Sequence, residues 1–425
     1  MITEQELKKK SIVFLYRQEI PLGFNSYKGV STNHVVSLKY EKYSGSLGII
    51  GMSGCGKTVL MKRIYTYIIV LFPEYYNYKR PAIIFDMQSE DHWRSAFPNS
   101  DSSNILWKQG ESPIRIKNIK CYAPSFTEEE CHDFDKVFGM SLDQFDYTDL
   151  MSIGLAPGGS RKIANLIKKN PECINDMNKF MEDIEQLPIN RTELSRMGKN
   201  EDYSFKEGLA TPLNYSSKNN IVDNLIIAYE DKVFVEPSDK KCMNSFIDEL
   251  NKGNVIIINI HQEKKYYSLY AGVILRDLYY SRRYTSRKKD NTFKAPVVVV
   301  EESDELAPND DSKRNNGSVR WLLQILKRAR KYDFYTIFTT QEAGALTGEI
   351  KSNNRTWIIG KMIATDYTYF SNIFTEEIMG AIRNLNSTKH EFCIVYPNGE
   401  FDTFYACNSL VDIHRESSMR TQNNI

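Results

Sequence analysis

The segment Gly51-Met-Ser-Gly-Cys-Gly-Lys57-Thr58 fits the phosphate-loop pattern G-x-x-x-x-G-K-[ST] at every fixed position. Its glycines let the backbone wrap so that successive N–H groups point at phosphates. An apolar strand precedes the loop and an apolar helix over 57–72 follows it, a context that a chance glycine turn would lack. We therefore expect ATP and Mg²⁺ as cofactors, with Lys57 on the β- and γ-phosphates, Thr58 on the metal, and a loop lined by Gly51, Ser53, Gly54, Cys55 and Gly56.

Two acids, Glu301 and Glu302, end a second apolar run over Val297–Val300. In P-loop motors the first such acid holds the Mg²⁺ shell and the next orients the attacking water. Glutamate is also common at solvated strand ends, so the acids alone leave an ordinary strand end open. With a phosphate loop upstream, they predict a metal ligand at Glu301 and a water-activating carboxylate at Glu302.

Gln341 directly follows an apolar run over Thr336–Thr340, where its amide could contact the γ-phosphate or the attacking water. An ordinary polar strand end fits this position equally well. Arg330 lies near the end of a helical segment, off the apolar stripe of that helix. Spacing alone favours a solvated basic helix terminus for Arg330, because cations are stabilised there by the helix dipole.

Short apolar runs alternate with helical segments along most of the chain, which predicts an α/β fold with a mostly parallel sheet covered on both faces. The expected strands are 47–51, 82–85, 255–260, 297–300, 336–340 and 357–359. Helices are expected around 57–72, 269–280 and 319–330. A turn signal at Pro397-Asn-Gly-Glu, between apolar runs at 392–396 and 401–405, predicts a hairpin.

The stretch from about 100 to 250 is more polar and has helical spacing at 128–138, 163–167 and 177–184. It predicts an inserted, mainly helical subdomain. The expected organisation is N-terminal strands over 1–45, a core of 46–100 and 242–415, an insert over 101–241, and a C-terminal tail over 416–425.

The 425 residues carry a net charge of +1, with 41% hydrophobic and 26% charged residues, so no general polyanion-binding signature exists. Basic groups could still be confined to the channel of a ring. Seven scattered cysteines without a C-x-x-C pair favour reduced thiols over disulfides or a zinc site. No apolar stretch reaches membrane-spanning length and no signal peptide is evident. We expect a cytoplasmic protein without direct membrane insertion.

Several segments together resemble the HerA/FtsK family of P-loop ATPases. The run Val297–Pro308 is similar to the HerA-type acidic motif, and Arg330–Gln341 is similar to the family's R-x-x-G…[ST]-Q segment. The stretch from Thr347 to Met362 resembles the matching part of FtsK, and Cys242–Asn259 resembles the entry to a core strand. The similarity covers about 1–95 and 242–415 and leaves out the helical insert.

The resemblance implies a RecA-like core, a hexameric ring with ATP sites between subunits, and double-stranded DNA threaded through the centre. It also implies that Arg330 is a finger acting on the neighbouring subunit's ATP, with Arg328 as a substitute. Arginine suits this role because it is always charged and forked. Partners implied by the family are further copies of the chain, double-stranded DNA, and a nuclease, capsid or conjugation protein.

The sequence departs from the family pattern at several positions. Ser303 and Asp304 stand where the family has Ala-His, Asp333 stands where a Gly is common, and Glu342 stands where the family has an Arg. Trp357 also occupies a position often held by Arg, whose role Arg355 or Lys361 could take. The departures leave the core ATP chemistry intact and weaken any transfer of lesser sensor roles.

A basic loop is expected between a core helix and the acidic-motif strand, with a solvated loop as the alternative to DNA contact. Its candidate DNA-binding residues are Arg282, Arg283, Arg287, Lys288 and Lys289. The leading hypothesis is an ATP-driven motor that translocates double-stranded DNA in packaging, conjugation, repair or defence. The alternatives are a secretion- or conjugation-type ATPase that energises a membrane-associated machine, and a nucleotide-dependent switch without translocation.

Overall fold

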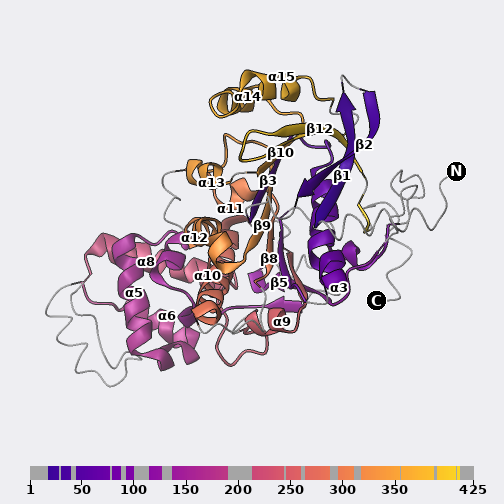
Figure 1. Cartoon of the computed structure of the whole chain (residues 1–425). Helices are drawn as coiled ribbons and strands as arrows, with labels where there is room; N and C mark the ends of the chain where they lie inside the picture. Colours follow the sequence, from indigo (N-terminus) through magenta and orange to yellow (C-terminus); the bar gives the residue numbers. More distant parts are fainter. Residues whose placement is uncertain are drawn as a thin grey trace.

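The computed structural model describes residues 18–27, 30–39, 45–76, 79–87, 92–99, 114–126, 136–189, 213–243, 246–259, 264–287, 295–310, 317–354, 356–386, 390–407 and 409–411. Within them, a single twelve-stranded sheet runs through the molecule (Figure 1). Its strands are β1 (Glu19–Tyr27), β2 (Val30–Lys39), β3 (Ser46–Ile50), β4 (Ala82–Asp86), β5 (Ile119–Pro124), β6 (Lys136–Phe138), β7 (Val255–Asn259), β8 (Val297–Val300), β9 (Tyr335–Thr340), β10 (Thr356–Ile359), β11 (Glu391–Val395) and β12 (Phe401–Ala406).

The strand order across the sheet is β2-β1-β12-β11-β10-β3-β9-β8-β4-β7-β5-β6. All neighbours from β10 to β6 are parallel, and the four strands from β2 to β11 extend the sheet in antiparallel fashion. The mostly parallel α/β fold predicted from the sequence is confirmed. The expected hairpin forms as well, with Val395 opposite Phe401 at its turn.

Helices cover both faces of the sheet (Figure 1). On one face lie α2 (Lys57–Thr66), the π-helical turn η1 (Tyr67–Leu71) and α3 (Phe72–Tyr76), and on the other lie α10 (Lys264–Arg287) and α12 (Gly317–Tyr332). Successive strand residues point to opposite faces, so Ile49 packs with the α2 layer and Ile50 with the α10 and α12 layer. Both faces are buried, which explains the unbroken Val/Ile runs.

The predicted helix over 57–72 continues to Tyr76 with a π-helical turn in its middle. Phe72 N–H donates to Tyr67 O, five residues back. Pro73 follows directly and has no N–H to continue the ordinary i→i−4 ladder. The proline therefore accounts for the local change of helix type.

The helical subdomain is smaller than the sequence predicts. β5 and β6 lie inside the range assigned to the insert, yet β5 pairs with core strand β7 and β6 extends the same sheet. The prediction of a helix over 128–138 is wrong for its last three residues, because 136–138 form β6. Residues 127–135 lie outside the described residues. The boundary at 101 is corrected accordingly, since backbone pairing assigns 119–124 and 136–138 to the core.

The remaining helices of this subdomain lie beyond α10 and α12, away from the sheet (Figure 1). They are η5 (Leu142–Gln144), α4 (Tyr147–Leu150), η6 (Met151–Ile153), α5 (Pro157–Lys169), η7 (Pro171–Asn175), α6 (Met177–Glu185) and α8 (Tyr215–Glu230). Arg276 on α10 anchors them, because its guanidinium bonds to the buried Asp149 carboxylate and to Gln144 O.

Short helices complete the core. They are η2 (His92–Ala96), α9 (Ile247–Asn251), α11 (Ser303–Leu306), α13 (Gly348–Asn353), α14 (Ala364–Ser371) and α15 (Glu376–Arg383). Across the part of the chain that the structure describes, no helix combines the length and the apolar character needed to cross a membrane.

Candidate active site

The glycine-rich loop joins the end of β3 to the start of α2, as its pattern predicts. Gly54 and Gly56 have φ of 78° and 99°, in the left-handed region that glycine enters without strain. The Lys57 ammonium folds over the loop and donates to Gly51 O at 2.6 Å and Met52 O at 3.1 Å. Ser53 and Gly54 are exposed, and α2 begins at Lys57, so the loop presents backbone N–H groups and a positive helix end to solvent.

Close packing beneath the loop fixes its shape. Cys55 is 2% exposed, and a Cβ added to Gly51 would lie 2.8 Å from its Sγ. Burial raises the pKa of this thiol. Met52 N–H donates to Lys361 O at 2.7 Å, and the His390 ring contacts Cys55 O through Nδ1 at 3.0 Å. The backbone that follows β10 and the histidine that precedes β11 therefore support the loop.

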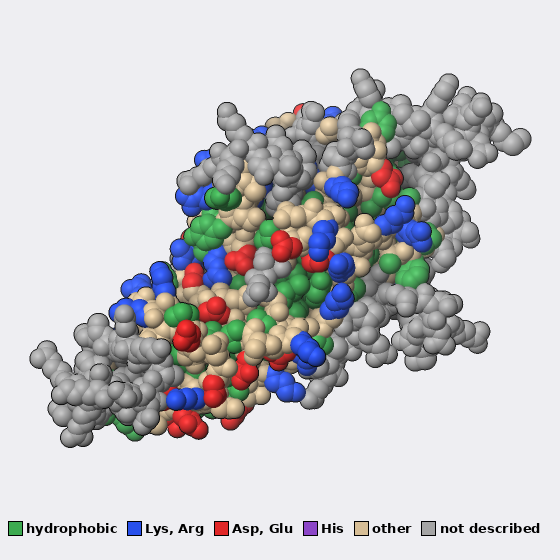
Figure 2. Space-filling view, turned by 90° about the horizontal axis from the view of Figure 1, so that it is seen from below, with side chains coloured by type: hydrophobic (Ala, Val, Ile, Leu, Met, Phe, Trp, Pro, Cys, Tyr) green, Lys and Arg blue, Asp and Glu red, His purple; other side chains and the backbone are tan. Residues whose placement is uncertain are grey.

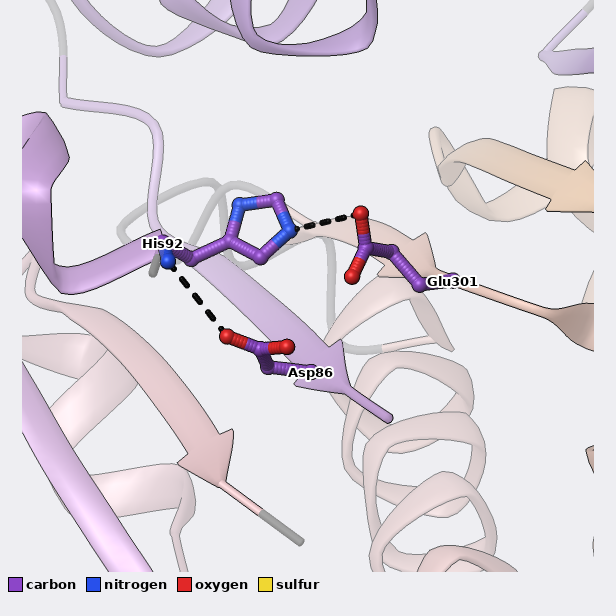
Figure 3. A group of neighbouring side chains, drawn as sticks. All are labelled: Asp86, His92 and Glu301. Atoms are coloured by element: carbon purple, nitrogen blue, oxygen red, sulfur yellow. Dashed lines mark hydrogen bonds and ion pairs between the residues drawn. The ribbon is translucent and has the colours of Figure 1, made fainter. Parts of the chain in front are cut away.

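Glu301 is buried at the end of β8, with 2% of its surface exposed. Its Oε1 lies 3.0 Å from His92 Nε2 (Figure 3). His92 begins η2 and is anchored by its own N–H, which donates to Asp86 Oδ2 at 3.4 Å. β4 and β8 are parallel neighbours, so the strand ends at Asp86 and Glu301 lie side by side.

Glu302 and Gln341, predicted separately from two strand ends, contact each other directly. Gln341 Nε2 donates to Glu302 Oε1 at 2.6 Å. Glu302 has φ of 42°, which is uncommon for a residue with a side chain. Its backbone N–H bonds to Thr339 Oγ1 at 3.3 Å, so β9 supports this conformation.

The family departures Ser303 and Asp304 have structural roles here. Ser303 Oγ donates to Thr339 O at 3.0 Å, and Asp304 accepts from Thr340 Oγ1 at 2.9 Å. Both contacts tie α11 to the last residues of β9, directly before Gln341. The substituted pair therefore holds the two strand ends of the site together.

The sheet order brings the predicted residues to one edge. β9 lies between β3 and β8, and the three strands are parallel, so the phosphate loop, Gln341 and Glu301 all follow carboxyl ends. Two strand spacings, about 10 Å, separate β3 from β8 at this edge. The donor set fits a nucleotide and Mg²⁺, since backbone N–H groups and Lys57 suit phosphates while the Thr58 hydroxyl and Glu301 suit a hard cation.

Arg330 is not part of this edge. α12 ends at Tyr332, just before β9 begins, and a Cβ on Gly45 would lie 2.8 Å from Ala329 Cβ, near the start of β3. Arg330 is exposed there, and β3 spans about 16 Å between that end and the phosphate loop. Arg330 therefore lies at the opposite edge of the sheet from the loop of its own chain.

Asp333, in place of a family glycine, has φ of 59° in the turn between α12 and β9. This left-handed conformation explains why glycine is common there, and Asp is among the residues that tolerate it. The carboxylate lies 3.5 Å from Arg80 Nη1, and the Arg80 guanidinium stacks 4.8 Å from the Tyr335 ring. Lys361 instead donates to Arg383 O at 3.1 Å, and Arg355 lies outside the described residues.

The predicted basic loop is wrong over 282–287, because α10 continues to Arg287. Arg282 is 9% exposed, and its Nε donates to Tyr332 O at 2.8 Å, so it joins α10 to α12. Arg283 lines a cavity of about 300 Å³ with Arg328 and Lys331. The side chain of Arg287 and both Lys288 and Lys289 lie outside the described residues.

Charge is mixed over much of the surface. On the face that Figure 2 shows, basic and acidic side chains are interspersed among the coloured residues, without a large field of one sign. This distribution agrees with the net charge of +1. The described residues on this face therefore form no broad basic surface for a polyanion.

Three residues near the site escaped prediction from the sequence. The polar end of the 82–85 run marked Asp86 only as a strand end, and nothing in the spacing of His92 or His390 connects them to the loop or the acids. His92 and His390 act across long sequence separations, so only the packed fold reveals their positions. A polar residue ending a second core strand was the available signal for Asp86.

The fold and the site define a P-loop NTPase with a RecA-like core. Among solved structures, the unbound bacterial conjugative coupling protein TrwBΔN70 has a TM-score of 0.55 at 11% identity, covering 96% of this chain and 93% of that chain. TrwB with the ATP analogue ADPNP has 0.54 at 12%, and with the GTP analogue GDPNP 0.53 at 11%, each covering 90% of this chain and 89% of the other. At such identities the likeness concerns the fold.

A family model described as "Helicase HerA, central domain" matches residues 29–278, more than half of the chain. The chain therefore belongs to the HerA central-domain family, within the HerA/FtsK type of P-loop ATPases. No curated protein matches the chain.

Proposed function

We propose that this chain is an ATP-hydrolysing motor that forms a ring, of six subunits on the family pattern, and translocates double-stranded DNA. The observation that carries the proposal is the Glu302–Gln341 contact of 2.6 Å at the sheet edge that also bears the phosphate loop. A loop that only binds nucleotide does not need an acid–amide pair there. Membership of the HerA family supports the DNA motor over other uses of ATP.

In this proposal each part of the edge has one task. The loop from Gly51 to Thr58 holds the phosphates through its N–H groups, and Lys57 neutralises charge on the β- and γ-phosphates. The Thr58 hydroxyl would bind Mg²⁺, and Glu301 would hold the water shell of this ion. Bound Mg²⁺ would supply further charge neutralisation. Glu302 accepts a proton from the attacking water while the oxygen of that water bonds to the γ-phosphorus. The β–γ bridging bond breaks, and ADP and phosphate are the products.

Gln341 keeps this carboxylate in place and contacts the attacking water or the γ-phosphate. Arg330, at the opposite edge of its own sheet, stabilises the charge of the transferring group in the neighbouring subunit. Such a site is complete only between subunits, so ring formation precedes efficient turnover. DNA contacts are proposed for basic residues near the end of α10 and directly after it in the sequence, with Arg283, Arg287, Lys288 and Lys289 as candidates.

We place the motor in the cytoplasm, where ATP and genomic or plasmid DNA are both available. TrwB is described as a bacterial conjugative coupling protein, and its structures with ADPNP and GDPNP support nucleotide binding by the shared fold. A conjugation, nuclease or capsid protein would then be the partner that directs the motor to its DNA.

The test combines mass photometry, with and without ATP, and steady-state ATP turnover with duplex DNA at two salt concentrations. We expect ATP to shift monomers toward rings, and duplex DNA to stimulate turnover at low salt with steep loss at high salt. Lys57→Ala is the control that should remove nucleotide binding and both responses. Turnover indifferent to duplex DNA in a protein that stays monomeric would contradict the motor and favour a switch. Rings stimulated only by membrane-associated partners would favour the secretion-type alternative.

A further inference from the structure

A chain of buried polar groups leads from the phosphate-loop helix to the acid of β8. Tyr65 on α2 contacts Ser95 Oγ at 2.7 Å and His92 Nδ1 at 3.1 Å through its hydroxyl. On the other side of the same ring, His92 Nε2 lies 3.0 Å from Glu301 Oε1. His92, Tyr65 and Ser95 are all 0% exposed, so these contacts are shielded from water.

The chemistry of the four groups constrains which atom carries each proton. His92 Nε2 and Glu301 Oε1 form a close polar contact of 3.0 Å, and because a carboxylate carries no proton, a proton between the two atoms belongs to His92 Nε2. In the neutral imidazole, Nδ1 is then an acceptor for the Tyr65 hydroxyl, which in turn accepts from Ser95. Burial raises the pKa of the Tyr65 phenol, so the hydroxyl keeps its proton. Imidazole is the side chain that can donate on one side and accept on the other in this line.

We propose that His92 is a positioning residue for Glu301, which it holds in one orientation at the sheet edge, and that Tyr65 and Ser95 set its tautomer. The inference rests on the proposed ATPase function. His92 itself contacts neither nucleotide nor water in the reaction. Its effect is exerted through the carboxylate that the proposal assigns to the Mg²⁺ shell, and hydrogen-bonded partners of metal-binding carboxylates commonly matter in this way.

The backbone reinforces this role. His92 N–H donates to Asp86 Oδ2 at 3.4 Å, at the end of the strand beside β8 (Figure 3). Glu301 N–H bonds to Phe85 O at 3.3 Å, so the two strand ends are held in register. Tyr65 lies about two turns along α2 from Lys57 and Thr58, roughly 11 Å by helix rise. A rigid helix therefore links the phosphate loop to the orientation of Glu301.

The first test compares His92→Leu, which removes both ring contacts, with His92→Gln, which keeps one N–H donor for Glu301. We expect His92→Leu to lower kcat about 10- to 100-fold and to raise the Mg²⁺ concentration needed for half-maximal rate. Binding of a fluorescent ATP analogue without Mg²⁺ should change less than about twofold, since the loop is untouched. His92→Gln should recover most of kcat, and Tyr65→Phe should fall between the two.

The second test needs no variant that could misfold. Selective ¹⁵N labelling of the six histidines should show one imidazole in the neutral form with the proton on Nε2, and Glu301→Gln should shift this resonance. The inference would be overturned if His92→Leu had the same kcat and Mg²⁺ dependence as the wild-type protein. It would also be overturned if His92 carried its proton on Nδ1. A wild-type protein that hydrolyses no ATP would instead refute the proposed function.

Discussion

Glu302 adopts a left-handed backbone conformation, with φ of 42°, at the point where β8 ends. Such conformations cost about 1–3 kcal/mol for residues with side chains and persist only when their surroundings enforce them. Here Thr339 holds the Glu302 N–H and Gln341 holds its carboxylate. At the residue scale, the strained position coincides with the group that the proposal assigns to water activation.

Replacing Glu302 with Gln should lower kcat by about 10²- to 10⁴-fold while ATP binding persists, because the amide cannot accept the proton. The change keeps the side-chain oxygen that accepts from Gln341, so the local geometry is preserved. Phosphate release and fluorescent-nucleotide titration measure the two effects. Glu305→Gln, one turn further on, is the matched control with near-normal turnover. Rapid hydrolysis by Glu302→Gln would transfer the role to Glu301 or Glu305.

The phosphate loop, Glu301, Glu302 and Gln341 could be predicted because each follows a local pattern at the end of an apolar strand. Their arrangement at one edge of the sheet, with Gln341 in contact with Glu302, could not, since it depends on β9 lying between β3 and β8. The predicted basic loop was wrong at Arg282 for a related reason. Its run of charges suggested a loop, but α10 continues through it, and packing of α10 against α12 buries the guanidinium beside Tyr332 O.

At the scale of elements, α9 fastens the outer strands of the sheet. The Glu249 carboxylate accepts from Lys120 Nζ on β5 at 2.5 Å, Lys252 Nζ at 2.9 Å and Asn254 Nδ2 at 2.7 Å. The hydrogen bond from Lys120 is the main reason that the pKa of Glu249 falls from 4.5 to about 2. Sequence periodicity cannot predict these side-chain hydrogen bonds. It also could not assign β5 and β6 to the core, because both strands lie in the polar stretch that was assigned to the insert.

Because the pKa of Glu249 is lower in the folded chain, unfolding takes up a proton between pH 4.5 and pH 2. The stabilisation is therefore present above pH 4.5 and lost as the pH falls toward 2. Glu249→Gln should destabilise the protein at pH 7 by up to about 1 kcal/mol, given partial solvent screening. The difference from wild type should shrink by pH 3.

Urea unfolding at the two pH values measures this difference. Glu376→Gln is the control, since Glu376 pairs with Arg383 at 3.2 Å but its side chain is 82% exposed. It should leave stability nearly unchanged at both pH values. An equal loss for Glu249→Gln at pH 7 and pH 3 would show that the ion pair does not account for the effect.

At the scale of the whole molecule, two parts of the proposed ATP site, the phosphate loop and Arg330, lie at opposite ends of the strands. The phosphate loop follows the carboxyl end of β3, and Arg330 lies near the opposite end of that strand. The family resemblance assigned Arg330 to a neighbouring subunit, and its position excludes the loop of its own chain. The parallel order of the sheet followed from the alternation of strands and helices. For the antiparallel extension from β2 to β11, the sequence indicated N-terminal strands over 1–45 and a hairpin turn, but not how these strands pair.

Arg330→Ala should lower kcat by about 10³-fold with little change in nucleotide affinity, because a finger stabilises charge mainly in the transition state. Mixing it with Glu302→Gln in equal amounts should restore activity. Random ring assembly pairs an intact Glu302 with an intact neighbouring Arg330 at about one interface in four. Turnover of the mixture is compared with that of each variant alone. A mixture no faster than the average of its components would argue against action between subunits.

The packing beneath the phosphate loop also has a consequence for chemical reactivity. A thiol attacks electrophiles and oxidants as its thiolate, and Cys55 is both covered and held in the protonated form by a raised pKa. Among the cysteines that the structure describes, Cys242 alone is not buried. N-ethylmaleimide should therefore label Cys242 well before Cys55, as peptide mass spectrometry can follow, and ATP turnover should survive the first modification. The loop would keep working under mild oxidation despite the cysteine at its centre.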